Sequence, residues 1–152
     1  LLLHDDDLSP AWLFEQGIDP VATACLVTTS GRSPLHVATH LEAFVTGAMA
    51  DVTHRWADRL GPVTAALSGV EALANWAREA GVRQIVTPYA PVGPNATALR
   101  ALDAALAPDG IRLVRLQRRF DSAAWPHATA GFFKFKEKIP TLVGGLKGIG
   151  AV

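Results

Sequence analysis

The stretch SGVEALANWAREAGVRQIVTPY, residues 68–89, decides the fold of this chain. Its first part has apolar residues at the spacing of an amphipathic helix: Val70, Leu73, Ala74 and Ala77, with Trp76 on the flank. Ser68 and Glu71 predict a capping box at the start of that helix, and Gly81 predicts its end. The run that follows, residues 83–89, is short and apolar and is broken by a proline, which is typical of a buried strand.

The same alternation of helix and strand extends in both directions. Further strands are predicted at residues 1–4, 21–29 and 111–117, with a weaker candidate at 62–67. One helix is predicted from Ser33-Pro34 to Gly61, and another from an Asn95 N-cap to the Asp109-Gly110 turn. Helices that alternate with strands apolar on both faces indicate a parallel sheet with right-handed crossovers. We therefore predict a Rossmann-like, three-layer α/β domain with a mainly parallel five-stranded sheet over residues 1–140, and a Gly-rich tail or linker over residues 141–152.

The composition describes a globular domain without overall basic or acidic character. Of the 152 residues, 49% are hydrophobic and 18% are charged, which suffices for a buried core. Fourteen Lys and Arg residues balance fourteen Asp and Glu residues, and this balance argues against a whole-domain surface for DNA. No apolar run reaches the roughly 18–20 residues of a membrane span, and no basic and apolar leader is present. We expect a cytoplasmic protein without membrane contact and, since the chain starts without Met, a piece of a longer polypeptide.

Ligands of parallel α/β sheets bind beyond the carboxyl ends of the strands. Those ends are predicted at residues 4–7, 28–32, 87–95 and 117–121. The three aspartates of the first loop suit either Mg²⁺ or a solvated turn. The proline-rich loop TPYAPVGPN, residues 87–95, either lines a ligand pocket or packs over the sheet edge. The candidate binding residues at these ends are Asp5, Asp7, Tyr89 and Asn95.

Motifs for other chemistry are missing from the sequence. It contains neither of the glycine-rich phosphate loops, G-x-G-x-x-G after a strand or G-x-x-x-x-G-K-[ST], and no G-x-S-x-G nucleophile motif. His36 and His40 lie four residues apart, as on one helix face, but no third zinc ligand stands at a fitting spacing. The single cysteine, Cys25, lies in an apolar run and is predicted to be a buried structural thiol.

Phenylalanine and lysine alternate near the end of the chain, at Phe132, Phe133, Lys134, Phe135 and Lys136. This pattern either places rings for base stacking between phosphate-binding lysines, or places rings in a hydrophobic seam whose rim the lysine stems cover. The balanced charge of the whole chain favours the seam.

Two long segments resemble the α/β domain of the DNA photolyase/cryptochrome family: ALANWAREAGVRQIVTPYAPVGP and LRALDAALAPDGIRLVRLQRRFDSAAWP. A Tyr-x-Pro-like loop of that family is matched by residues 89–91, a Gly-Ile turn by residues 110–111, and an Asp after the next strand by Asp121. The opening HDDDLSP is similar to the family's Asp-Leu-Arg loop, with Asp7-Leu8 in register.

The resemblance implies a domain that does not perform the chemistry. In that family an all-helical domain holds FAD and carries out light-driven electron transfer, and we expect it on the same or a separate chain. A folate or deazaflavin antenna pigment would then lie near Asp5, Asp7, Tyr89 and Asn95, and DNA would be reached through the parent protein. That parent would be a deoxyribodipyrimidine photolyase or a blue-light receptor. The Phe–Lys segment would lead toward the flavin domain or pack on it.

Two other functions stay open at this point. One is a free-standing Rossmann-like nucleotide-binding protein, similar to the universal stress or electron-transfer flavoprotein domains, although the phosphate loop is missing. The other is a local nucleic-acid module built on the Phe–Lys segment.

Overall fold

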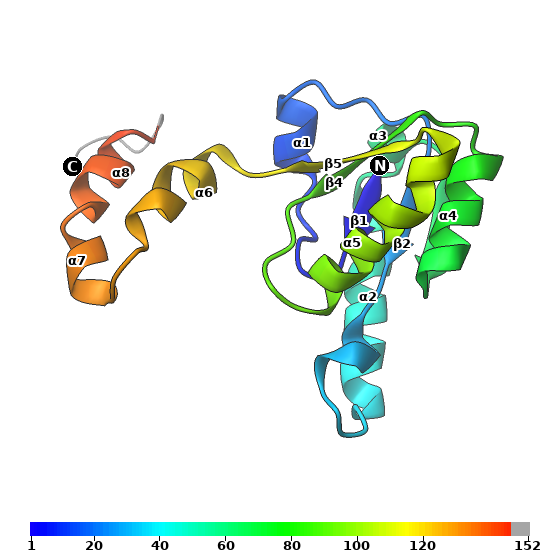
Figure 1. Cartoon of the computed structure of the whole chain (residues 1–152), viewed down its shortest axis with the longest axis horizontal. Coiled ribbons are helices and arrows are strands. Elements are labelled where there is room, and N and C mark those ends of the chain that lie inside the picture. The colour runs from blue at the N-terminus through cyan, green and yellow to red at the C-terminus, as the bar shows by residue number, and fades with distance from the viewer. Residues whose placement is uncertain (147–152) are drawn as a thin grey trace. The chain divides into compact units, whose positions relative to one another are not determined.

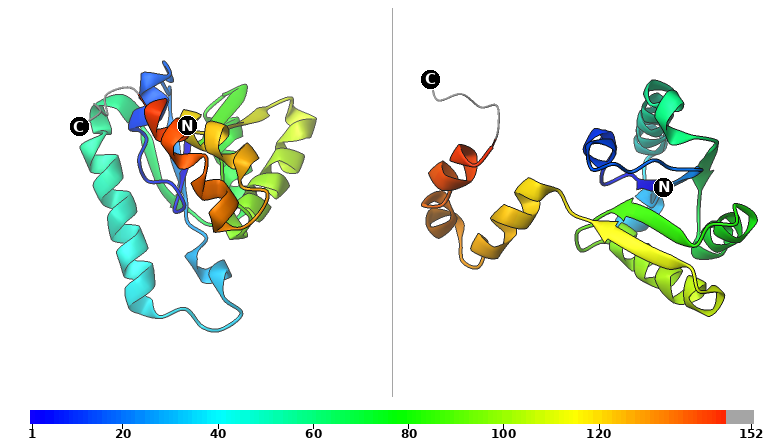
Figure 2. Two further views of the ribbon diagram at one scale, coloured as in Figure 1. Left: turned by 90° about the vertical axis from the view of Figure 1, so that its left-hand side faces the viewer. Right: turned by 90° about the horizontal axis from the view of Figure 1, so that it is seen from above.

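The computed structural model describes residues 1–146, and the chain divides into two compact units (Figures 1 and 2). The α/β unit comprises residues 1–116, and the helical unit begins at Gln117. The boundary predicted after residue 140 falls inside helix α8 (Ile139–Gly144) of the helical unit. The part of the Gly-rich tail from residue 147 onward lies outside the described residues.

All five predicted strands are present, and they form two parallel sheets. Strands β1 (Leu2–His4), β2 (Thr23–Leu26) and β3 (Val63–Leu67) form one sheet in the order β1-β2-β3. Strands β4 (Gln84–Pro88) and β5 (Arg112–Leu116) form the other. β1 contacts β4, but β1 has only three residues, and among the described strands no backbone ladder joins the two sheets. The fold is thus mixed α/β with parallel sheets, and a single five-stranded sheet is not confirmed.

Helices cover both faces of the strands in the α/β unit (Figure 2). They are α1 (Ala11–Glu15), α2 (Thr39–Arg55), α3 (Ala57–Leu60), α4 (Val70–Glu79) and α5 (Pro94–Leu106), with short 3-10 turns at Thr29–Arg32 and Ala107–Asp109. Successive strand side chains point to opposite faces, so β1 and β2 contribute to two cores. Leu2, Ala24 and Leu26 pack with α4 and α5. Leu3 and Cys25 pack with α1, α2 and α3.

The first long helix begins later than the Ser33-Pro34 signal predicts. Helix α2 starts at Thr39, and no helix is present between the 29–32 turn and that residue. The Ser33 hydroxyl accepts a hydrogen bond from the Leu35 backbone N–H at 3.0 Å, so this side chain closes a local turn and does not cap a helix. The N-terminal half of α2 extends beyond the sheet (Figure 1) and leaves Leu41 and Phe44 exposed.

Two predicted helix caps are wrong by one or two residues, while one predicted end is confirmed. Gly69 is the N-cap of α4, so Ser68 lies outside the helix and no capping box forms. Gly93 precedes α5, whose first helical residue is Pro94, and a proline suits that position because its missing N–H needs no partner there. Asn95 is therefore inside the helix, and it is buried. Gly81 follows the end of α4 in the left-handed region, φ +63°.

The helical unit consists of α6 (Arg119–Ala124), a 3-10 turn at Trp125–His127, α7 (Phe132–Lys136) and α8. The Phe–Lys segment is thus a short helix. Its alternating Phe and Lys residues therefore project around a helix and do not point to two opposite faces, as they would in a strand. No helix within residues 1–146 combines the length and the apolar composition that crossing a membrane requires.

Candidate functional site

A buried carboxylate at the end of β1 organises the strand-end region. The Asp5 side chain is 1% exposed, and its oxygens accept hydrogen bonds from Asn95 Nδ2 (2.8 Å), Thr29 Oγ1 (3.0 Å) and Arg32 Nη2 (3.1 Å). The backbone N–H and hydroxyl of Thr28 add longer bonds at 3.4 and 3.3 Å. A buried charge is stable only when it is paired and fully hydrogen-bonded. Asp5 thus ties the end of β1 to the 28–32 turn and to the start of α5.

Arg32 supplies the positive charge of this cluster. Its guanidinium contacts both Asp5 and Asp6. Burial acts to raise the pKa of Asp5, but hydrogen bonds from Asn95 and Arg32 and the charge of Arg32 outweigh it, so the pKa lies below its usual value. Hydrogen bonding to Asp6 is the main reason that the pKa of Arg32 is raised. Asp5 is therefore a carboxylate, without the protonated state that a general acid needs.

His4 connects the two sheets. It is fully buried, and its Nε2 lies 3.0 Å from the carbonyl oxygen of Pro88 at the end of β4. Its Nδ1 accepts the backbone N–H of Asp6 at 3.3 Å. An acceptor role for Nδ1 and a carbonyl beside Nε2 fit the neutral tautomer with the proton on Nε2. The β1–β4 junction is thus held by a side chain where a backbone ladder is missing.

Two buried side-chain oxygens, Asn95 Oδ1 and Thr87 Oγ1, have no hydrogen-bond partner among the described residues. Both residues are fully buried. Buried polar atoms are usually satisfied by protein or water. Thr87 stands on β4 and Asn95 on α5, so both belong to the elements that frame the 87–95 loop.

The structure brings together two of the four predicted ligand residues. Asp5 and Asn95 are hydrogen-bonded. Asp7 faces its own turn, where Oδ1 accepts the Ser9 backbone N–H at 3.0 Å. Tyr89 is 40% exposed and lines a separate cavity that neither Asp5 nor Asn95 lines.

Charge and ligand geometry limit what the strand ends can bind. Three aspartates and one arginine, Arg32, leave the region net negative, so a phosphate group would be repelled there. No group of three or more His, Cys, Asp or Glu side chains within residues 1–146 is arranged to hold a metal ion. The Cys25 thiol is buried, and burial raises its pKa to about 11.

The cavity beside Tyr89 has a volume of about 180 Å³ and lies between the 87–95 loop, α5 and β5. It is lined by Tyr89, Ala90, Val92, Ala96, Leu99, Arg100 and Arg115. We call it the Tyr89 pocket. It combines an aromatic ring and apolar walls with two guanidinium groups.

The Phe–Lys segment presents its rings to solvent. Phe132 and Phe133 are 65% and 81% exposed, and their rings form an edge-to-face pair with centroids 5.7 Å apart. Lys134 and Lys136 are also exposed.

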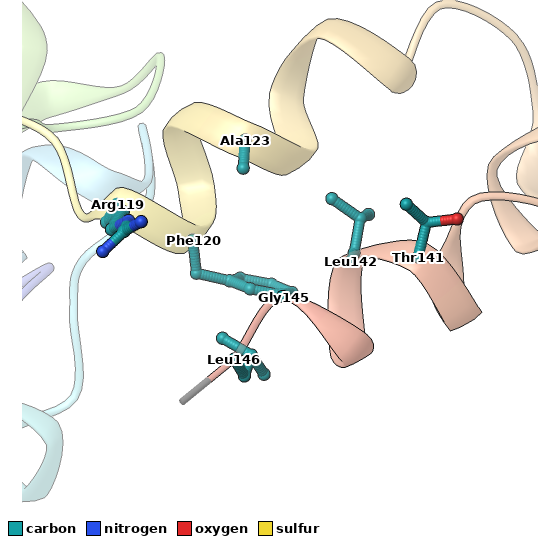
Figure 3. Close-up of a pocket in the computed structure, with 7 residues that line it drawn as sticks. All are labelled: Arg119, Phe120, Ala123, Thr141, Leu142, Gly145 and Leu146. Atoms are coloured by element: carbon teal, nitrogen blue, oxygen red, sulfur yellow. The ribbon is translucent and has the colours of Figure 1, made fainter. Parts of the chain in front are cut away.

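A further cavity, of about 340 Å³, lies between α6 and α8 of the helical unit (Figure 3). Phe120 and Leu142 line it from the two helices.

Sequence reasoning missed several residues that hold the strand ends together. The sequence places residues 28–32 at the end of a strand, but no motif there singles out Arg32 or Thr29, and His4 reads as one histidine among five. The chain matches no protein-family model and no curated protein. Its candidate function therefore depends on the geometry and on the pattern of the sequence.

Proposed function

We propose that this chain is the non-catalytic α/β part of a two-part flavoprotein similar to the photolyases and cryptochromes. The observation that carries the proposal is that the helical unit, over residues 117–146, has exposed apolar side chains and no buried core. None of residues 117–146 is buried, and large apolar side chains stand exposed there: Phe120, Trp125, Phe132, Phe133, Ile139 and Val143. So small a segment without a core is not stable by itself. It needs a surface that covers these side chains.

The α/β unit supports the same proposal. Leu41 and Phe44 lie three residues apart on α2, where they share a face that the strands do not cover. Exposed apolar patches of this kind mark interaction sites. We infer that a partner domain packs against the helical unit, and that in the resembled family this partner is the helical domain that holds FAD.

The finer fold that we propose is one continuous sheet in the order β3-β2-β1-β4-β5. This order is supported by the β1–β4 contact, by the bond from His4 to Pro88, and by cores on both faces of the strands. It is the doubly wound order, with its switch point between β1 and β4. A folate or deazaflavin antenna would lie at that point, above Asp5 and Asn95, and the net negative charge there favours an uncharged ring over a phosphate.

The test is the absorption spectrum of the protein encoded by the complete reading frame. We expect bound flavin, seen as its near-ultraviolet and blue bands. A Phe133→Asp variant should lose flavin because a charge replaces a ring in the docking surface. Val21→Asp is the matched control, since Val21 is 77% exposed in the α/β unit, and it should retain flavin. A colourless protein, or equal flavin content in the two variants, would refute the proposal.

The alternative is a free-standing nucleotide-binding protein. The observation that favours it is the pair of buried oxygens without a partner within residues 1–146, Thr87 Oγ1 and Asn95 Oδ1, which could accept hydrogen bonds from a base while the phosphates lie away from Asp5 and Asp6. A thermal-shift screen with nucleotides separates the two proposals. A nucleotide at 100 times its dissociation constant should stabilise such a protein by about 2.7 kcal/mol. A colourless protein that shows this stabilisation would establish the alternative.

A further inference from the structure

The Tyr89 pocket has charge that the surrounding protein does not fully neutralise. Arg115 donates to the Leu99 carbonyl oxygen at 3.1 Å and pairs with Asp103 at 3.1 Å. Arg100 donates to Thr97 Oγ1 at 3.1 Å, and among residues 1–146 no carboxylate pairs with it. The pocket therefore carries one compensated and one uncompensated guanidinium. An arginine fork of this kind suits the planar, bidentate recognition of carboxylate and phosphate.

A backbone hydrogen bond and three prolines restrict the loop that forms one wall of the pocket. The Tyr89 backbone N–H donates to the Leu116 carbonyl oxygen at 2.6 Å, which ties the start of the loop to the end of β5. Pro88, Pro91 and Pro94 limit the backbone of the loop. A preformed site loses little conformational entropy on binding.

We propose that the Tyr89 pocket binds a phosphate or carboxylate group carried on a planar ring. The anion would lie against Arg100 and Arg115, and the ring would lie over Tyr89. The cavity holds about 180 Å³, whereas pockets that enclose a drug-sized ligand hold roughly 300–1,000 Å³. The pocket therefore encloses only part of the ligand. The exposed ring of Tyr89 and the exposed Val92 offer an apolar surface for the rest.

This site differs from the strand-end cluster in both charge and composition. Asp5 and Asp6 make the cluster negative, while Arg100 and Arg115 make the Tyr89 pocket positive. The inference does not rest on the proposed flavoprotein function, because the chain could bind such an anion with or without a flavin partner.

The experiment is a ligand titration of the whole chain, and binding is measured by calorimetry and by the shifts of backbone amide NMR signals. The probes are AMP, which carries a phosphate, and benzoate, which carries a carboxylate. Two control probes separate the parts of the ligand: adenosine lacks the anion, and inorganic phosphate lacks the ring. Arg100→Gln removes a charge-assisted contact, and loss of such a contact corresponds to a roughly tenfold or greater weakening. Arg83→Gln is the matched control, because Arg83 is an exposed arginine outside the pocket.

We expect AMP or benzoate to bind more tightly than both control probes, and to shift the amides of the 87–95 loop. Arg100→Gln should weaken that binding about tenfold, and Arg83→Gln should leave it unchanged. Tyr89→Phe should keep the affinity because the ring remains, while Tyr89→Leu should lower it. Failure of both probes to bind at about 10 mM, a concentration well above a 1 mM dissociation constant, would overturn the proposal. Equal binding by the two arginine variants would do the same.

Discussion

Replacing Asp5 should remove the connection that holds the strand ends together. In an Asp5→Ala variant, the buried Asn95 amide and Thr29 hydroxyl lose their acceptor, while the Arg32 guanidinium keeps Asp6 as its partner. Each buried donor that is left without an acceptor costs about 1–3 kcal/mol. The lost pairing with Arg32, whose side chain is 40% exposed, adds about 0–1 kcal/mol. A domain of this size has about 5–15 kcal/mol of stability. We therefore expect Asp5→Ala to remove a large part of this stability.

The isosteric Asp5→Asn variant makes the effect measurable by urea denaturation. It keeps the size of the side chain but removes the charge that pairs with Arg32. The matched control is Asp51→Asn, which breaks the exposed pair with Arg55 on the surface of α2. Exposed pairs contribute about 0–1 kcal/mol, so the control should unfold almost like the wild type. Equal losses in the two variants would refute the view that Asp5 organises this region.

The pH dependence gives a second readout for Asp5. Its pKa in the folded protein lies below the ordinary value of 3.8, so the unfolded chain binds its proton first as the pH falls. The stability from Asp5 is then complete above about pH 4 and is lost as the pH falls through the folded-state pKa. The difference in unfolding free energy between wild type and Asp5→Asn should shrink over that acid range. A difference that stays constant down to the lowest pH would contradict this assignment.

Three further predictions concern other parts of the chain. Gly61 has φ +62°, and a Cβ added at this position would lie 3.0 Å from the Pro20 carbonyl oxygen, so Gly61→Ala should cost about 1–3 kcal/mol in a urea melt. Gly47→Ala, inside α2 with nothing within 4 Å, should instead stabilise the protein by about 0.5–1 kcal/mol. A Gly61→Ala variant more stable than Gly47→Ala would contradict this prediction. Cys25 should not react with a thiol reagent at about pH 8 until the protein is unfolded, because the thiol is buried with a pKa of about 11; fast reaction of the native protein would show that the core is open there. If the Phe–Lys segment binds single-stranded nucleic acid, Lys134→Glu with Lys136→Glu should abolish the binding in a gel-shift assay, and binding that survives would exclude this segment as the nucleic-acid surface.

The caps show where local sequence reasoning reaches its limit. Ser68 and Asn95 carry good N-cap side chains, yet Gly69 and Gly93 precede the helices. Asn95 is buried, and its amide donates to a carboxylate 90 residues away in the chain. A cap forms within one turn of helix and can be predicted from the sequence. The hydrogen bond that draws the Asn95 side chain to the distant carboxylate of Asp5 cannot be predicted in that way.

In the candidate site, too, the sequence predicted some of the neighbouring residues and the tertiary structure decided the others. The rule that ligands lie at the carboxyl ends of parallel strands leads to Asp5 and Asn95, which the structure joins. The same rule groups Tyr89 with them, but the structure places Tyr89 on a different pocket with Arg100 and Arg115. Those two arginines stand on α5 and β5, and only their packing brings them together.

The sequence by itself determined the strands, the long helices α2, α4 and α5 and the parallel α/β class, because apolar periodicity and glycine or proline signals act over a few residues. It did not predict the short helices α1, α6, α7 and α8. The tertiary structure alone decided which polar groups meet. Arg32 reaches Asp5 because the 28–32 turn packs against the end of β1, and His4 reaches Pro88 because β1 lies beside β4. Such contacts join residues up to 90 positions apart. They depend on how whole elements pack, and no local pattern encodes that.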